Sequence, residues 1–278
     1  MTRTLRAVAA LGAATLALSL AACAPTADTS GDASGYITDG KLTIGTGEPA
    51  YYPWVIDDAP ESGEGFESAI AYAVADELGF AKEDVVWVRT TFDEAIAPGP
   101  KDFDFNLQQF SITDERKQNV DFSSPYYETT QVVITTSASK AAGATSIADL
   151  KDFLIGAQTG TTSFDAIEQQ IKPTAGAQVF NTNDDAVLAL QNGTVDAIVL
   201  DLPSAFFATG VQLDGGLIIG QLPQPDGKSG DEFGLVLPKD SPLTATVTAA
   251  VDSLRDSGKL ADIATQWLAD AGSAPVLK

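Results

Sequence analysis

Short apolar runs alternate with amphipathic stretches along most of the chain after residue 40. The runs predict buried strands at residues 41–45, 85–88, 131–135, 153–157, 179–180, 195–201, 217–220 and 232–237. Between them, apolar residues recur every three or four positions, which predicts helices at residues 65–78, 147–151, 163–171, 183–191, 203–208, 243–254 and 260–268. This alternation indicates an α/β protein with mainly parallel strands.

The first 22 residues have a different pattern. Arg3 and Arg6 precede an apolar run from Ala7 to Ala22, which ends at Cys23. A basic start and an apolar run too short for a stable spanning helix are typical of an export signal. The residues after Cys23 are small and polar, so we expect residues 23–35 to form a flexible tether.

The composition excludes several classes of function. The chain has 278 residues and a formal net charge of −22, which argues against binding to nucleic acid or, by charge, to anionic lipid. It contains no histidine, which removes histidine-based catalytic triads and most zinc sites. Cys23 is the only cysteine, so no intramolecular disulfide or thiolate cluster can form. We therefore expect no metal and no cofactor.

The most informative stretch runs from Asp104 to Thr130 and is rich in hydroxyl and amide side chains. These polar residues lead into one arginine, Arg116. A guanidinium presents a planar fork of donors that matches a carboxylate, and neighbouring hydroxyls and amides add neutral hydrogen bonds. Taken alone, Arg116 fits a ligand contact and a surface arginine on a polar loop equally well.

The pattern Ser-x-Thr-x-x-Arg at residues 111–116, followed by Val-Asp-Phe-Ser-x-Pro-Tyr-Tyr at residues 120–127, resembles the signature of family 3 extracellular solute-binding proteins. These are the amino-acid receptors of ABC importers, and the resemblance extends from about Leu42 to Trp267. It implies a two-lobed, type II periplasmic-binding-protein-like fold. Each lobe would be a mainly parallel sheet flanked by helices, and two hinge crossovers would join the lobes.

For the first lobe, the resemblance implies a carboxylate site and a side-chain site. Arg116 and Ser111 would bind the ligand carboxylate, with Gln109 beside them, and Tyr51 and Phe92 would surround the ligand side chain. Tyr51 fits packing at the base of its loop equally well, and Phe92 could be a packing residue at a helix start.

The first lobe also departs from the family pattern. The bulky amides at positions 108 and 109 replace small residues, and an extra residue near Glu48 makes its alignment uncertain. Whether Gln108, Gln109 and Glu48 face the ligand stays open, and so does the identity of the amino acid.

For the second lobe, Thr161 and Thr162 follow a predicted strand and a glycine turn and open a helix. A helix N-terminus favours an anion, although plain capping of the helix is an alternative role for these hydroxyls. The phrase Gly-x-x-Asp-Ala-x-x-x-Asp at residues 193–201 resembles the family pattern in which the last acid, here Asp201, pairs with the ligand ammonium. An N-cap for the helix at 203–208 is the alternative role for Asp201.

The N-terminal segment resembles a family pattern as well. Leu20-Ala21-Ala22-Cys23 is similar to the bacterial lipobox, which implies a lipoprotein signal peptide at residues 1–22 and lipidation of Cys23. An ordinary secretory signal with an incidental cysteine is the alternative.

Together these features predict a domain order and a function. Residues 36–130 would form the first part of lobe 1, residues 131–228 lobe 2, and residues 229–278 the rest of lobe 1. We expect a monomeric, non-enzymatic protein, lipid-anchored outside the bacterial cell membrane, that delivers an amino acid to an ABC permease. The alternatives are a ligand sensor for a membrane receptor and a secreted dehydratase on the same fold.

Overall fold

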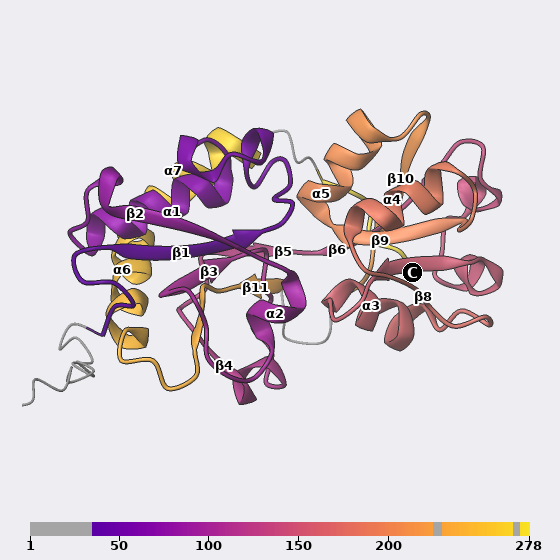
Figure 1. Ribbon diagram of the computed structural model, residues 1–278. Coiled ribbons are helices and arrows are strands. Elements are labelled where there is room, and N and C mark those ends of the chain that lie inside the picture. The colour runs from indigo at the N-terminus through magenta and orange to yellow at the C-terminus, as the bar shows by residue number, and fades with distance from the viewer. Residues whose placement is uncertain (1–34, 225–229, 269–272) are drawn as a thin grey trace, which may run out of the picture.

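The computed structural model describes residues 35–224, 230–268 and 273–278. Two lobes lie side by side, and each is built on a five-stranded sheet with helices on its faces (Figure 1). This arrangement confirms the predicted two-lobed α/β architecture.

The sheet of lobe 1 has the order β2-β1-β3-β12-β4. Its strands are β1 (Leu42–Gly47), β2 (Val85–Thr90), β3 (Phe105–Leu107), β4 (Val120–Phe122) and β12 (Val236–Pro238). β1 is parallel to β2 and β3, whereas β12 is antiparallel to β3 and β4. Four strands therefore run in one direction, and β12 runs in the other because it enters this lobe from the hinge.

The helices of lobe 1 cover both faces of its sheet. α1 (Phe66–Glu77), α6 (Thr244–Asp256) and α7 (Lys259–Leu268) bury their apolar sides in one core with β1 residues such as Leu42 and Ile44. α2 (Phe92–Ile96) belongs to a second, smaller core with Phe103 and Phe110. α1 ends before Gly79, which has a positive φ, as its sequence predicts.

Lobe 2 repeats this design with the sheet order β10-β6-β9-β7-β8. Its strands are β6 (Gln131–Thr136), β7 (Ile155–Gln158), β8 (Gln178–Phe180), β9 (Ala197–Asp201) and β10 (Gly216–Gln221), and its helices are α3 (Thr162–Ala166), α4 (Asn183–Gln191) and α5 (Leu202–Phe207). β7 is parallel to β8 and β9, and β6 is antiparallel to β9 and β10. Here β6 is the reversed strand, again because it enters from the hinge.

Short helical turns join these elements. Turns of 3-10 type lie at Ile56–Asp58, Pro60–Ser62, Lys82–Asp84, Arg116–Gln118, Lys140–Gly143 and Ala148–Asp152, and π turns extend α3 and α5 at Ile167–Ile171 and Ala208–Gln212. The helix expected at residues 163–171 is thus α3 plus a π turn. The hydroxyl of Thr182 caps α4 by accepting from the Asp185 N–H.

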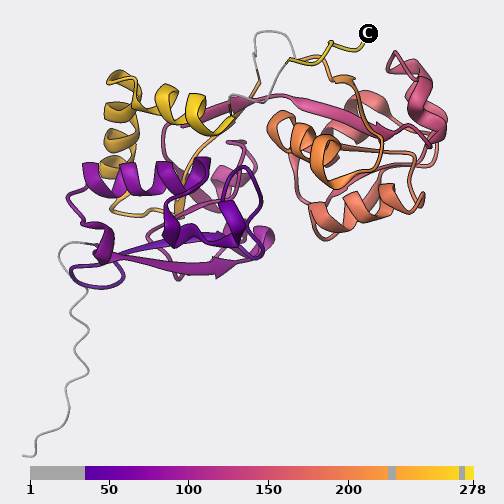
Figure 2. The same ribbon diagram turned by 90° about the horizontal axis from the view of Figure 1, so that it is seen from above.

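The hinge is a two-stranded antiparallel ribbon of β5 (Tyr127–Thr129) and β11 (Asp231–Phe233). β5 leads into β6, and Figure 2 shows this magenta segment passing from one lobe to the other. The strand expected at residues 232–237 is therefore two strands, β11 in the hinge and β12 in lobe 1. Gly234 lies between them, where a Cβ would come within 2.9 Å of the Ile112 side chain.

The C-terminal residues differ from the expected lobe boundaries, which placed all of 229–278 in lobe 1. Val276 forms a parallel bridge with Gln221, and the Leu277 N–H donates to the Gln221 carbonyl at 2.8 Å. Leu277 is 4% exposed and belongs to a core cluster of lobe 2. The last residues of the chain are too few to show a strand or helix pattern. Their packing against lobe 2 could therefore not be predicted from the sequence.

Candidate functional site

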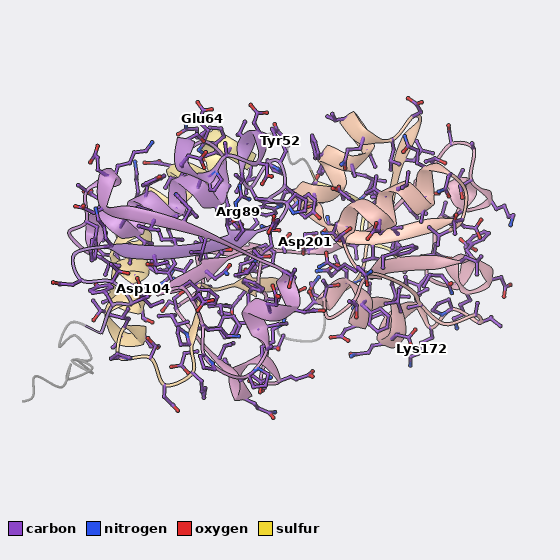
Figure 3. The ribbon with its side chains drawn as sticks, in the orientation of Figure 1. Tyr52, Glu64, Arg89, Asp104, Lys172 and Asp201 are labelled. Carbon is purple, nitrogen blue, oxygen red and sulfur yellow. The ribbon has the colours of Figure 1, made fainter. Side chains whose placement is uncertain are left out.

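A cavity of about 300 Å³ lies between the lobes. Its walls come from residues at or just after the carboxyl ends of β1, β3, β7, β8 and β9, where open α/β sheets place their ligands. In Figure 3, Tyr52 and Asp201 lie between the lobes, whereas Asp104 and Lys172 lie toward opposite ends of the molecule.

All eight side chains predicted to contact a ligand line this one cavity: Tyr51, Phe92, Gln109, Ser111, Arg116, Thr161, Thr162 and Asp201. Gln108 and Glu48, whose orientation the sequence left open, line it too. The structure thus brings the predicted residues together, while their contact with a ligand stays a prediction.

Arg116 begins a 3-10 turn after β3 and is 7% exposed. Its Nη1 donates to the Ser111 carbonyl at 2.7 Å, and its Nη2 donates to the Gly160 carbonyl of lobe 2 at 2.8 Å. Its Cζ lies 5.2 Å from the centre of the Phe92 ring. Burial lowers the pKa of Arg116, and nearby acids oppose that shift.

These contacts leave the charge of Arg116 available to a ligand. Within the described ranges, no carboxylate forms an ion pair with it. A guanidinium has five N–H donors, and its two hydrogen bonds to neutral carbonyls use only part of them. The group can therefore donate to a carboxylate in the cavity.

The hydroxyls near Arg116 have separate roles. Thr161 Oγ1 accepts from the Phe164 N–H at 3.2 Å and donates to the Gln158 carbonyl at 2.7 Å, so it caps α3. Thr162 Oγ1 lies 3.2 Å from Ser111 Oγ across the cleft. Ser111 and Thr162 hence bring one hydroxyl from each lobe within hydrogen-bond distance in the cavity wall.

Asp201 is the last residue of β9 and occupies the N-cap position of α5, but its side chain makes no capping hydrogen bond. Its Oδ1 instead accepts from Gln131 Nε2 at 2.9 Å. Burial, followed by the charge of Asp231, raises the pKa of Asp201 to about 7, against the opposing effects of Gln131 and Arg116. A cationic group in the cavity would stabilise the ionised form of this carboxyl.

Gln109 is held by a buried acid of α1, Glu67. The Gln109 N–H donates to Glu67 Oε1 at 2.8 Å, and the Gln109 side-chain amide and the Tyr126 hydroxyl also donate to Glu67. Glu67 is 2% exposed, and burial raises its pKa to about 7. Gln109 itself has a φ of 54°, so this contact stabilises an uncommon backbone conformation.

Gln108 is anchored within lobe 1. Its Nε2 donates to Thr90 Oγ1 at 2.7 Å and to Asn106 Oδ1 at 3.1 Å. With the amide nitrogen occupied in this way, Gln108 offers the cavity only its amide oxygen.

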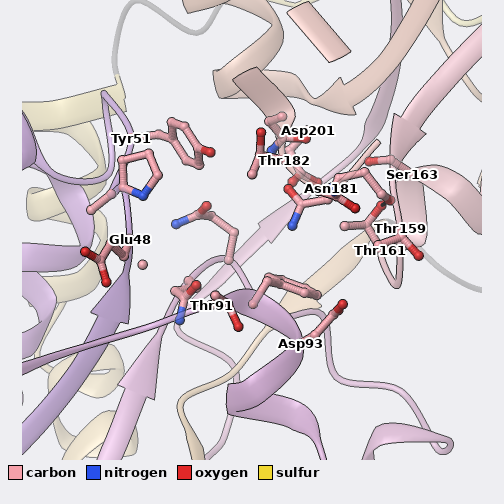
Figure 4. A pocket seen from close by; sticks show the side chains of 18 of the residues that line it. Glu48, Tyr51, Thr91, Asp93, Thr159, Thr161, Ser163, Asn181, Thr182 and Asp201 are labelled. Atoms are coloured by element: carbon pink, nitrogen blue, oxygen red, sulfur yellow. Dashed lines mark hydrogen bonds between the residues drawn. The ribbon is translucent and has the colours of Figure 1, made fainter. Parts of the chain in front are cut away.

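The opposite end of the cavity is formed by the loop after β1. Figure 4 shows Glu48 and Tyr51 there, across the cavity from Thr159 and Thr161 of lobe 2, with the Tyr51 hydroxyl directed at Thr182. Burial raises the pKa of Tyr51 to about 12, with the charge of Asp184 as the next cause. Arg89 braces this loop, because its Nη1 donates to the Gly47 carbonyl at 2.7 Å and pairs with Asp58 Oδ1 at 2.5 Å.

Sequence reasoning missed several residues of the site. Thr159, Asn181 and Thr182 of lobe 2 and Asp93 of lobe 1 line the cavity. Gln131, the partner of Asp201, was expected only as part of a strand. Gln131 is a polar residue at the start of an otherwise apolar run, and this break in the pattern could have identified it as a residue of the site.

No group of three or more Cys, His, Asp or Glu residues in the described part of the chain is arranged to hold a metal ion. Among the described helices, none combines the length and apolarity needed to cross a membrane.

The sequence model described as bacterial extracellular solute-binding proteins, family 3, matches residues 42–270. The chain is 30% identical to an L-arginine-binding protein of Pseudomonas aeruginosa over 84% of this chain and 89% of that protein. It is also 30% identical to a probable histidine-binding protein of Campylobacter jejuni over 87% of this chain and 90% of that protein.

Solved structures resemble the chain as well. An ancestral arginine-binding protein bound to arginine has a TM-score of 0.67 at 28% identity and covers 82% of this chain and 98% of its own. An ancestral amino acid-binding protein, a precursor of cyclohexadienyl dehydratase, has a TM-score of 0.68 at 27% identity and covers 82% of this chain and 96% of its own. These likenesses confirm the expected type II periplasmic-binding-protein-like fold.

Proposed function

The chain belongs to the bacterial extracellular solute-binding proteins of family 3, and from this we propose that it captures an amino acid between its lobes and delivers it to an ABC importer. The observation that carries the proposal is the placement of Arg116 and Asp201. One comes from lobe 1 and the other from lobe 2, and both line the same cavity. Opposite charges on two lobes match the two charges of a zwitterion.

The ligand carboxylate would lie against the Arg116 fork and the hydroxyls of Ser111 and Thr162, and the ammonium against Asp201. Hydrogen bonds to charged groups contribute about 1.5–3 kcal/mol each. Three or four of them sum to about 5–12 kcal/mol before the costs of association. Micromolar affinity needs a net of about −8 kcal/mol, so burial of the ligand side chain would have to offset those costs. Because such a ligand touches both lobes only when they are closed, it would favour closure.

The rest of the cavity favours a ligand side chain with a positive charge. Glu48 and Asp93 line it in addition to Asp201, whereas Arg116 is the only cation among the described residues that line it. A zwitterion uses Arg116 and Asp201 and leaves an excess of negative charge. The relatives that bind arginine or histidine support the same preference.

The location of the protein follows from the N-terminal sequence, which lies outside the described residues. Residues 1–22 would direct export and be removed, Cys23 would carry the lipid, and residues 23–35 would tether a monomer to the outer face of the cell membrane. Labelling of cells with radioactive palmitate should mark the protein, and Cys23→Ala should abolish the label. A labelled Cys23→Ala variant would exclude this anchor.

A thermal-shift screen against the common amino acids tests the proposed function most directly. We expect the largest increase in melting temperature with L-arginine or another cationic amino acid, and a much smaller increase with a matched amine or carboxylate alone. Calorimetry should then give micromolar affinity or better. If no zwitterion raised the melting temperature, the proposed function would be wrong.

The ancestral neighbour that preceded a dehydratase gives a second function some support. Dehydration needs a general acid and a base poised at a substrate carbon. We propose that the cavity carboxyls Glu48, Asp93 and Asp201 act in recognition instead. Asp201 is already engaged by the Gln131 amide. Turnover of a prephenate-like acid by the purified protein would favour the enzyme.

A further inference from the structure

Gln131, the first residue of β6, joins four segments through one side-chain amide. It is 4% exposed. Its Oε1 accepts from Ser163 Oγ of α3 at 2.5 Å, and its Nε2 donates to Asp201 Oδ1 at 2.9 Å and to Asp231 Oδ2 at 2.8 Å. Thr162 Oγ1 is a more distant acceptor at 3.2 Å.

The chemistry of these neighbours fixes the orientation of the amide. Ionised carboxylates only accept hydrogen bonds, so the NH₂ group must face Asp201 and Asp231. The Ser163 hydroxyl then donates to the amide oxygen. An apolar side chain at position 131 would leave the two carboxylates near one another with no donor between them, which is unfavourable in a buried place.

The topology connects this amide to the hinge. Gln131 is paired with Asp201 in the β6–β9 ladder, and neighbours across an antiparallel pair lie on the same face of the sheet. Asp231 is paired with Thr129 in the hinge ribbon. Gln131 follows the hinge strand β5, and Asp231 lies in the other hinge strand, β11. The Gln131 amide thereby links the hinge to Asp201 in the cavity.

Other charged and titratable groups also face Asp201. Arg116 attracts its charge, and Glu67 of α1 and Asp231 of β11 repel it. Tyr126 and Tyr127 lie close enough for the charge of Asp201 to contribute to their raised pKa values. Within the described ranges, Gln131 is the only residue that donates a hydrogen bond to the Asp201 side chain.

We propose that Gln131 is a positioning residue that holds Asp201 as a carboxylate directed at the ligand ammonium. The negative charge of Asp231 has the opposite effect, because it makes ionisation of Asp201 less favourable. The hinge then sets the pH range in which the amino acid is bound. The inference rests on the proposed function, because it assigns the ammonium of the ligand to Asp201.

Calorimetry with L-arginine from pH 5 to pH 9 tests the inference with two variants that act in opposite directions. Gln131→Met keeps a similar volume but removes the donors, so the carboxylate becomes less favourable. The acid-side midpoint of the affinity should move to higher pH, and affinity at pH 7 should fall roughly tenfold. Asp231→Asn removes a repelling charge and can still accept from Gln131, so the midpoint should move to lower pH.

Glu232→Gln is the matched control, since it removes one negative charge from the next, exposed residue of the same strand. It should leave the midpoint unchanged. 5-Guanidinopentanoate, which is arginine without its ammonium, is the second probe. This probe should bind more weakly than L-arginine, and either variant should change its affinity much less. A general loss of structure would instead weaken the binding of both probes equally.

The outcomes separate the two proposals. Binding of L-arginine by all variants with the wild-type midpoint would overturn the role of Gln131 and leave the proposed function intact. Absence of wild-type binding at every pH would overturn both. If circular dichroism shows that Gln131→Met does not fold, the downward shift expected for Asp231→Asn decides alone.

Discussion

The Nη2 of Arg116 in lobe 1 donates a hydrogen bond to the Gly160 carbonyl in lobe 2, at 2.8 Å. Trp54 Nε1 makes a second bridge between the lobes, to Ser204 Oγ at 3.0 Å. The lobes are therefore in direct contact around the cavity. Arg116 belongs both to this contact and to the predicted carboxylate site, so a ligand bound there would join an existing link between the lobes.

Removal of the Arg116 side chain should weaken binding of every accepted amino acid. Arg116→Ala loses several charge-assisted hydrogen bonds, so we expect affinity to fall by roughly 100-fold or more by calorimetry. Arg116→Lys should recover part of this loss, because it restores the charge without the planar fork. Lys117→Ala, at the exposed neighbouring position, is the control and should bind normally. Unchanged affinity in Arg116→Ala would remove Arg116 from the site.

Glu48 should contribute to selectivity rather than to general affinity. Glu48→Gln removes a negative charge from the end of the cavity formed by the loop after β1, so the preference for L-arginine over L-glutamine should fall by roughly three- to tenfold. Glu61→Gln removes an equal charge from an exposed residue outside the cavity lining and should not alter the ratio. An unchanged ratio in Glu48→Gln would mean that this carboxylate does not face the ligand side chain.

The aromatic pair of Tyr52 and Phe207 should favour the closed state without contacting the ligand. Their ring centres lie 4.5 Å apart, one in each lobe, and such pairs contribute about 0.5–1.5 kcal/mol. Phe207→Ala should therefore lower the affinity for all accepted amino acids by roughly three- to tenfold and leave the order of their affinities unchanged. Leu188→Ala, at an exposed position on α4, is the control. A changed ranking would show that the pair acts on specificity.

Stability should decrease as the pH rises from 5 to 8. Glu67 has its pKa raised from 4.5 to about 7, so in this range the native state holds a proton that the unfolded state has lost. The pKa of Asp201 is also raised, so this carboxyl likewise lowers stability as the pH rises. Carboxyls with lowered pKa values, such as Asp121, titrate at lower pH and do not offset this trend.

Denaturant unfolding of the ligand-free protein at pH 5 and pH 8 measures the effect. Glu67 should account for up to roughly 3 kcal/mol of the difference. Glu67→Gln should remove that part, whereas Glu77→Gln, at an exposed position of the same helix, should not. Equal pH dependence in the two variants would contradict the raised pKa of Glu67.

The fold could be predicted because its signals are local. Apolar periodicity gives most of the strands and helices, and Gly79 marks the end of α1. The periodicity does not give the three-residue strands β3, β4 and β5, which are too short to show a pattern. The eight predicted side chains meet in one cavity because strand ends gather at one edge of each sheet. The residue pattern around Arg116 and Asp201 was therefore sufficient to locate them.

Contacts between distant segments could not be predicted in the same way. The Gln131 amide joins residues up to 100 positions apart, and nothing near it in sequence indicates Asp231. Glu67 and Gln109 are 42 positions apart, so their contact depends on how α1 packs against the sheet. The different roles of Thr161 and Thr162 depend on which of the two is the N-cap of α3, and helix boundaries are not determined that finely by the sequence.

The return of the C-terminal residues to lobe 2 places the two ends of the described chain on different lobes. Tyr36 packs against the core of lobe 1, while the Lys278 carbonyl accepts from the Ile147 N–H of lobe 2 at 3.0 Å. A donor and an acceptor fluorophore attached near these two positions would report the separation of the lobes by energy transfer. The native chain thus offers, without rearrangement, the attachment points of an optical sensor for its own ligand.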